Sequence, residues 1–279
     1  MVFHVLPGDP GSPVILHVPH ASRELTERAR AGLLVDDAEL SDELDNLTDA
    51  HTDLIALRAA GGSPVRPWTF ANGLSRLVVD PERFPDEREE MRAAGMGAVY
   101  THGYAGRRLR ASADDQALID EHFHPYGKAI SDLVTERLAA TGRAVIVDVH
   151  SYPTLRLPYE LHGDGPRPQI CLGADDFHTP PALLDEARTA FAGYETAVNT
   201  PFAGAYIPLT HHGRDEAVTA LMVEIRRDTY MTEPAGPPHE GLGEIADALT
   251  ALIAAVQPPH RADAKHAAGA PSRCRRPAP

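Results

Sequence analysis

The fold of this chain is decided by the stretch Arg143-Ala-Val-Ile-Val-Asp-Val-His-Ser-Tyr152. Residues 144–149 are almost all apolar or β-branched, and a glycine and a proline bound the stretch, which predicts a fully buried strand. Asp148, His150 and Ser151 stand at its carboxyl end, the edge of an open α/β sheet where ligands bind. An imidazole held there suits a metal ligand or a general base, although a lone strand-end histidine is more often an ordinary hydrogen-bonding group.

Further apolar segments also end in polar residues. Residues 13–20 predict a second buried strand that delivers His20 to the same kind of position, and residues 217–225 predict a last strand that carries Glu224 near its end. Leu74 to Asp80 predicts a third strand. Weaker strand patterns occupy residues 169–173 and 194–198.

Helical patterns alternate with these strands. The first predicted helix starts at Thr48 or Asp49 and runs to Gly61-Gly62. The second occupies residues 114–140 and should be kinked or divided at Pro125. Two more are predicted over residues 180–192 and 241–256. Residues 21–46 are acidic and carry loop signals. The alternation predicts a three-layer α/β/α fold with a mostly parallel or mixed sheet. We expect one catalytic domain over residues 1–257 and a disordered tail over 258–279, which lacks apolar periodicity.

Composition limits the possible partners. The 279 residues are 43% hydrophobic and 24% charged, an ordinary balance for a globular protein, and their net charge of -14 argues against nucleic acid or an anionic membrane. An acidic substrate must therefore be held by locally placed arginines, and the oligomeric state is not determined by these features. With only Cys171 and Cys274, and no leader or apolar run of about 18 residues, the expected compartment is the cytoplasm.

Four residues form a candidate catalytic set. His20, His150 and Glu224 come from predicted strand ends, and Asp49 comes from a predicted helix start. Two histidines and a carboxylate are the ligands of hydrolytic zinc sites, and a second carboxylate can act as general base toward water. Because the four lie far apart in the chain, spacing alone does not bring them together.

Two motifs carry a resemblance to the zinc carboxypeptidase superfamily: Val149-His-Ser-Tyr152 and Val223-Glu-Ile-Arg-Arg-Asp228. Residues 14–231 more closely resemble the N-formylglutamate amidohydrolase family, which shares that superfamily's fold. The motifs of that match are Val18-Pro-His-Ala-Ser22, Thr48-Asp-Ala-His51, Ser75-Arg-Leu-Val-Val-Asp80 with Arg83, Asp148-Val-His-Ser151, and Pro201-Phe-Ala-Gly with residues 224–231.

This resemblance implies a zinc-dependent amidohydrolase that cleaves a small N-acyl amino acid, with N-formyl-L-glutamate as the leading candidate and histidine degradation as its setting. It implies that His20, Asp49 and His150 bind the zinc and that Glu224 is the general base. Arg83 would bind a substrate carboxylate, with Arg76 as a second candidate for that role. The functional alternatives are a carboxypeptidase-like or other N-acyl amino acid hydrolase, or a catalytically silent metal-containing binding protein.

Each site residue also has a structural alternative. Asp49 is a possible helix cap. Glu24 is its rival as ligand because His20-Ala-Ser-Arg-Glu24 resembles the superfamily's His-x-x-Glu, with one residue too many. Glu224 could form a salt bridge with a nearby arginine, and Arg76 could pair with Asp80. Two departures concern the substrate pocket: Glu82 stands where the superfamily has asparagine, and Gly127 where the family often has histidine.

Overall fold

The computed structural model describes residues 3–112, 116–161 and 165–257 of the chain. Its centre is a seven-stranded sheet in the order β1-β3-β2-β4-β7-β5-β6. The strands are β1 (Phe3–Leu6), β2 (Val14–Val18), β3 (Trp68–Asn72), β4 (Ala144–Tyr152), β5 (Ile170–Gly173), β6 (Thr196–Val198) and β7 (Val218–Arg226). The sheet is mixed: β1 runs antiparallel to β3 and β5 antiparallel to β7, while the other neighbours are parallel.

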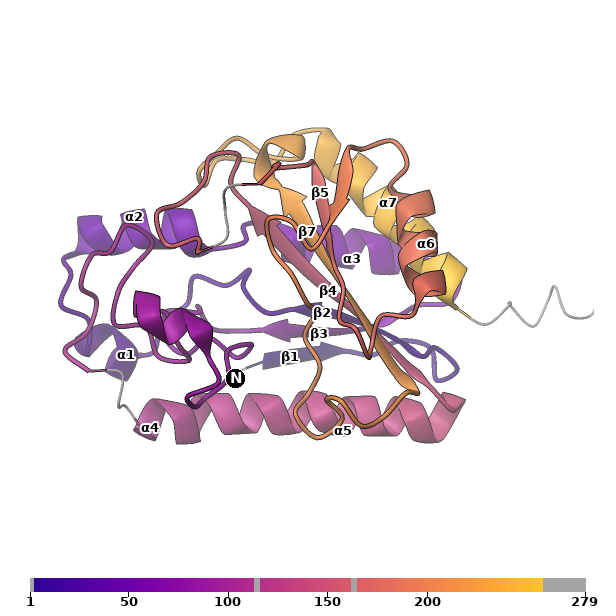
Figure 1. Cartoon of the computed structure of the whole chain (residues 1–279), viewed down its shortest axis with the longest axis horizontal. Helices are drawn as coiled ribbons and strands as arrows, with labels where there is room; N and C mark the ends of the chain where they lie inside the picture. The colour runs from indigo at the N-terminus through magenta and orange to yellow at the C-terminus, as the bar shows by residue number, and fades with distance from the viewer. Residues whose placement is uncertain (1–2, 113–115, 162–164, 258–279) are drawn as a thin grey trace, which may run out of the picture.

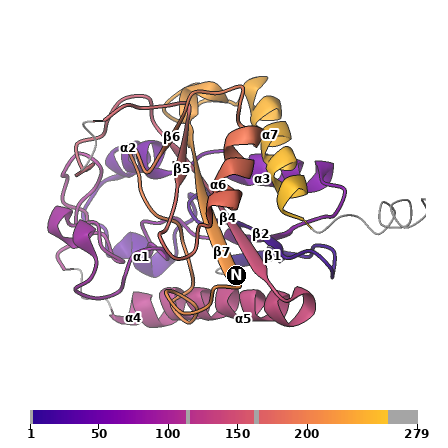
Figure 2. The ribbon, with the colours of Figure 1, turned by 45° about the vertical axis from the view of Figure 1, so that its right-hand side comes forward.

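Helices cover both faces of this sheet, which confirms the predicted α/β architecture. Figure 1 shows α5 (His124–Thr141) along one face, and α3 (Thr52–Gly62), α6 (Pro181–Ala190) and α7 (Gly241–Val256) on the other. The turned view in Figure 2 shows α7 between α3 and α6, and α7 contacts both. The remaining helical segments are α1 (Glu27–Ala31), α2 (Asp37–Leu47), α4 (Gln116–Leu118), a π-helical turn (Ile119–Phe123), and 3-10 turns at Glu90–Ala94 and Arg227–Thr229.

The central strand β4 is buried along its whole length, as its sequence predicts. Its odd-numbered residues, such as Val147 and Val149, pack in the core beneath α3, α6 and α7, whereas Ile146 packs with α5. Successive side chains of a strand alternate between faces, so Asp148 and His150 follow Ile146 on the α5 side. The polar side chains at the end of β4 therefore lie past the apolar residues that pack against α5.

Three local predictions are wrong or incomplete. Residues 74–80 form no strand; the third strand is β3, and Leu77 and Val78 are buried in two different side clusters of a looped segment. The apolar residues there pack in clusters with the short helices α1, α2 and α4 rather than on a sheet face, and a run of hydrophobic residues does not distinguish the two cases. The acidic segment contains α2, whose start has a reciprocal capping box between Asp36 and Glu39.

The third error concerns α3, which begins at Thr52 rather than at Thr48 or Asp49. Its N-cap is His51, in the left-handed region at φ 66°, and the side chain of Asp49 does not cap the helix. The backbone carbonyl of Asp49 accepts the hydrogen bonds of Thr52 instead. The carboxylate of Asp49 is therefore free for other contacts.

The other element predictions agree with the structure within a few residues, including the break before Pro125, where a π-helical turn precedes α5. The predicted tail over 258–279 lies outside the described residues. Among the helices that the structure describes, none combines the length and apolar character that crossing a membrane requires.

Two glycines allow a matched test of backbone stability. Gly127 lies inside α5, and a Cβ there would meet open space, so Gly127→Ala should stabilise the protein by about 0.4–1 kcal/mol through a less flexible unfolded chain. Gly142 ends α5 at φ 78°, so Gly142→Ala should destabilise it by about 1–2 kcal/mol. Urea unfolding of both variants measures the two changes. A loss of stability in Gly127→Ala would contradict the helical geometry of α5.

Candidate active site

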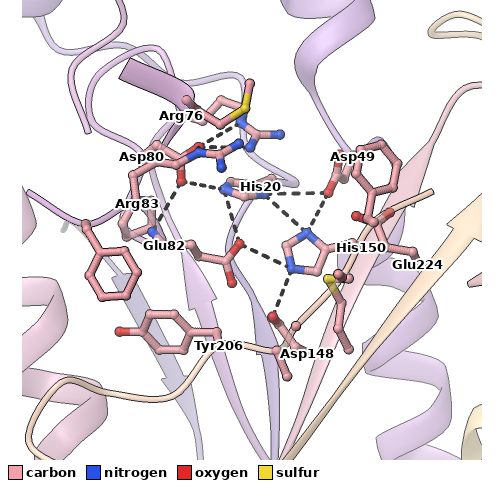
Figure 3. A pocket seen from close by; sticks show the side chains of 18 of the residues that line it. His20, Asp49, Arg76, Asp80, Glu82, Arg83, Asp148, His150, Tyr206 and Glu224 are labelled. Carbon is pink, nitrogen blue, oxygen red and sulfur yellow. Dashed lines mark hydrogen bonds and ion pairs between the residues drawn. The ribbon is translucent and has the colours of Figure 1, made fainter. Parts of the chain in front are cut away.

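All six predicted site residues line one cavity of about 1200 Å³ at the carboxyl ends of the parallel strands. They are His20, Asp49, Arg76, Arg83, His150 and Glu224 (Figure 3). The sheet explains the meeting of three of them. His20 follows β2, β2 and β7 flank β4, and the register pairs His150 with Glu224 directly across β4 and β7.

Three donor atoms converge at the centre of this site. Nδ1 of His20 lies 3.3 Å from Nδ1 of His150, and Oδ2 of Asp49 lies 3.1 Å from Nδ1 of His150 and 3.7 Å from Nδ1 of His20. Around a tetrahedral zinc with bonds of about 2.0–2.1 Å, neighbouring donor atoms lie about 3.3 Å apart. The predicted ligand set therefore has the separation that one metal ion requires.

The opposite nitrogens of both histidines face other carboxylates. Nε2 of His20 donates to Asp80 at 2.9 Å, and Nε2 of His150 contacts Asp148 at 3.1 Å without the angle of a hydrogen bond. Metal-binding histidines ordinarily direct their second ring nitrogen at a carboxylate or carbonyl, which orients the ring. This arrangement leaves the Nδ1 atoms as the metal-facing pair.

A second combination of donors uses the Nε2 atoms. Glu82 Oε2 lies 3.3 Å from Nε2 of His150 and 3.7 Å from Nε2 of His20, so these three also form a group that could hold a cation. Because Asp80 already takes the Nε2 proton of His20, the set with Asp49 fits a metal better. Glu24, the rival carboxylate from the sequence, is solvent-exposed and does not line the cavity.

The charges around the two histidines favour positive charge at this point. Burial lowers the pKa of His150, but the carboxylates of Asp148 and Glu82 outweigh burial and hold the pKa well above its usual value. Burial raises the pKa of Asp49, but hydrogen bonds with His150 and His20 outweigh it and keep the pKa far below its usual range. A metal ion binds such a site by displacing the protons of the histidines.

Glu224 stands beside this cluster as a buried carboxyl group. It is 8% exposed, and its Oε2 has no hydrogen-bond partner among the residues that the structure describes. Burial raises the pKa of Glu224 to about 7, and the charge of Asp49 adds to the rise. No described arginine forms a salt bridge with Glu224, so the structural alternative for this residue is not observed.

Arg76 and Arg83 differ in how strongly other residues of the chain already bind them. Arg76 binds Asp80 through Nη2 at 2.8 Å and also donates to Tyr100, which matches the structural alternative for this residue. Arg83 lies 3.5 Å from Asp80 and 3.5 Å from Glu89, is 25% exposed, and its Nε makes no hydrogen bond to a described residue. Arg83 is therefore the arginine with capacity to bind a ligand.

The structure adds four residues that the sequence did not assign to the site. Asp80 and Asp148 orient the histidines, Glu82 faces them, and Arg227 is 2% exposed with Nη2 3.5 Å from Oδ1 of Asp49. Asp80, Asp148 and Arg227 stand inside the quoted motifs, and Glu82 is one of the departures noted for the substrate pocket; those positions are the available signal. The contacts of these residues depend on strand register, on the folding of the loop after β3 and on the packing of α2, which the sequence pattern does not contain.

Comparison with known proteins identifies relatives of this arrangement. An N-formylglutamate deformylase of Pseudomonas aeruginosa is 29% identical over 254 residues, which cover 86% of this chain and 90% of the relative. An N-formylglutamate deformylase of Pseudomonas putida is 26% identical over 235 residues, 79% of this chain and 82% of the relative. The crystal structure of N-formylglutamate amidohydrolase from Ralstonia eutropha has the same fold, with a TM-score of 0.74 at 22% identity over 91% of this chain and 96% of that one.

The family assignment covers the whole site. A model of the family described as N-formylglutamate amidohydrolase matches residues 12–231, a range that contains all of the cavity residues discussed above. The chain is a hydrolase and belongs to the N-formylglutamate amidohydrolase family.

Proposed function

We propose that this protein is a zinc-dependent deformylase that hydrolyses N-formyl-L-glutamate to formate and L-glutamate. The observation that carries the proposal is the convergence of Nδ1 of His20, Nδ1 of His150 and Oδ2 of Asp49 within 3.7 Å, beside the buried Glu224. The names of the deformylases that the chain resembles support the substrate. A place in histidine degradation stays a prediction.

In this proposal His20, Asp49 and His150 hold the zinc, since two imidazoles and one carboxylate are a common ligand set of hydrolytic zinc sites. When bound, zinc polarises the formyl oxygen and lowers the pKa of water. Arg227, whose Nη2 lies 3.5 Å from Oδ1 of Asp49, holds that carboxylate from the side of α2, where its Nη1 donates to the carbonyl of Asn46. The ligand set is thereby held in place before substrate enters.

Glu224 moves the proton in this reaction. Its carboxylate takes a proton from the attacking water and delivers it to the nitrogen of glutamate as the amide bond breaks. A carboxyl group with a pKa of about 7 can perform both halves of this transfer near neutral pH, whereas an exposed glutamate would hold the proton too weakly to return it. The burial of Glu224 at the end of β7 therefore serves the chemistry.

The experiment that tests this proposal is a substrate panel with the zinc-loaded full chain. N-formyl-L-glutamate should be cleaved with a higher kcat/KM than N-acetyl-L-glutamate, N-formyl-L-leucine and a peptide with a free carboxyl terminus. Release of formate and of primary amine should be equal. Faster cleavage of the peptide would favour the carboxypeptidase-like alternative, and faster cleavage of the acetyl compound another N-acyl amino acid hydrolase.

Arg83 should determine the preference for an acidic substrate. A guanidinium pairs with a carboxylate through two parallel hydrogen bonds that lysine cannot reproduce, so Arg83→Lys should raise KM for N-formyl-L-glutamate by the equivalent of about 1.5–3 kcal/mol. The same variant should lose much less on N-formyl-glutamine amide, which has no free carboxylate. Arg88→Lys is the matched control, because Arg88 is 60% exposed and pairs with Asp86 at the surface. Equal losses on both substrates would assign Arg83 to the scaffold.

A further inference from the structure

Glu82 occupies an unusual place in the cavity, between the proposed zinc ligands and a third histidine. Its Oε2 lies 3.3 Å from Nε2 of His150, and its Oε1 lies 3.5 Å from Nδ1 of His17. Oε1 is buried and has no hydrogen-bond partner among the described residues. The two oxygens of one carboxylate thus face two different groups of donors.

The second group consists of His17, Glu82 and Asp148. The register of β2 and β4 places His17 beside Asp148, with Nδ1 2.8 Å from Oδ1, and the donor atoms of all three residues lie within 4.8 Å of one another. The side chains are 0%, 16% and 2% exposed, respectively. Nε2 of His17 is hydrogen-bonded to the hydroxyl of Tyr126 at 2.5 Å, which holds Nδ1 toward the two carboxylates.

The hydrogen-bond donors around these carboxylates show what this group lacks. In the described part of the chain, Glu82 and Asp148 form ion pairs with histidines and with no lysine or arginine. Zinc on Nδ1 of His20 and His150 would leave each ring neutral, with one proton on Nε2. That proton of His20 goes to Asp80.

The proton of His150 cannot satisfy both remaining carboxylates. It can serve either Asp148 or Glu82, and His17 donates at most one more proton toward Asp148. Oε1 of Glu82 is buried 3.5 Å from Nδ1 of His17 and has no hydrogen-bond partner among the described residues, which is unfavourable inside a protein. A cation held by His17, Glu82 and Asp148 would give that oxygen a partner.

We propose that His17, Glu82 and Asp148 hold a second divalent cation on the side of His150 opposite the zinc site. One imidazole and two carboxylates are donors that suit Zn²⁺ or Mn²⁺. This inference rests on the proposed function, because the second cation would lie beside the proposed zinc site. A second cation would also add positive charge to the cavity that Arg83 lines, where an acidic substrate needs it in a chain of net charge -14.

Metal content of the full chain tests this directly. The protein is loaded with ZnCl₂ or with MnCl₂ alone and freed of excess metal by gel filtration, and its metal content is measured by mass spectrometry. The wild type should hold about two ions per chain, and Glu82→Gln and His17→Gln about one. His4→Gln, on the exposed strand β1, is the matched control and should equal the wild type.

A second measurement covers the case in which His17→Gln fails to fold. Glu82→Gln keeps the shape of the side chain, and its melting temperature shows whether the fold is retained. The integrated electron paramagnetic resonance signal of the manganese-loaded protein should correspond to two bound ions per chain in the wild type and to one in Glu82→Gln.

The remaining outcomes separate the two proposals. A wild type that saturates at one ion, lost in Asp49→Asn and kept in Glu82→Gln, overturns the second site and leaves the proposed function standing. Two ions in wild type, Glu82→Gln and His17→Gln alike would place the second ion elsewhere. A wild type that binds no metal overturns both proposals.

Discussion

Glu224→Gln should lower kcat by about two to four powers of ten and leave zinc content and melting temperature unchanged. Glutamine keeps the size of the side chain but cannot accept the proton of water, so the expected loss is that of positioned proton transfer. Since Glu224 is buried beside His150 and has an oxygen without a hydrogen-bond partner in the described structure, the amide can enter the same space.

Kinetics of the zinc-loaded variant with N-formyl-L-glutamate measure this effect. Glu136→Gln, on the exposed side of α5 and away from the cavity, is the matched control and should keep the activity of the wild type. A fall of KM without a fall of kcat, or turnover close to that of the wild type, would assign the proton transfer to another group.

His150→Ala should abolish tight zinc binding and, with it, activity. The wild type should hold zinc at the site of His20, Asp49 and His150, and loss of one of three protein ligands leaves too few for a stable site. Zinc that binds only the folded state should stabilise the wild type by about 4 kcal/mol at a free concentration 1,000 times Kd. Chelation should therefore lower the melting temperature of the wild type and not that of His150→Ala.

The two carboxylates that the sequence left as rivals give this experiment its control. Asp49→Asn should lose zinc as His150→Ala does, since Oδ2 of Asp49 lies 3.1 Å from Nδ1 of His150. Glu24→Gln should retain it, because Glu24 is exposed and outside the cavity. Retention of zinc by Asp49→Asn would transfer the ligand role to Glu82, which faces the opposite nitrogens of the same histidines.

The parts of the fold that could be predicted are those with a local signal. Buried strands such as β4 appear as short runs of β-branched residues, and α7 was predicted with its observed ends because its apolar residues repeat at helical spacing. The failures lie where tertiary packing decides. Leu77 and Val78 are as apolar as strand residues but lie in two clusters with the short helices outside the sheet. Helix α2 has few apolar residues because it buries only one side.

The residues of the site also divide into those that the sequence reveals and those that only the structure reveals. His150 and Glu224 could be recognised because polar residues at the ends of buried strands are conspicuous in sequence. The contacts of Asp80, Glu82 and Arg227 could not, because each depends on how a loop or a 3-10 turn folds back over the sheet. Hydrogen bonding to the second nitrogen of a histidine leaves no pattern in the chain, so the carboxylates that orient the ligands emerge only in three dimensions.

The pairing of His150 with Glu224 across β4 and β7 has a mechanical consequence. These strands are parallel neighbours in the middle of the sheet, so the backbone positions of the proposed metal ligand and the proposed general base can move apart only if the two strands shear and break their shared hydrogen bonds. Arg83, by contrast, lies in a segment with little regular structure between β3 and the Glu90–Ala94 turn. Mutation in that segment can therefore reshape substrate choice while the proposed metal ligands and Glu82 are kept, which makes residues 83–89 the place to begin redesigning this enzyme for other N-formyl compounds.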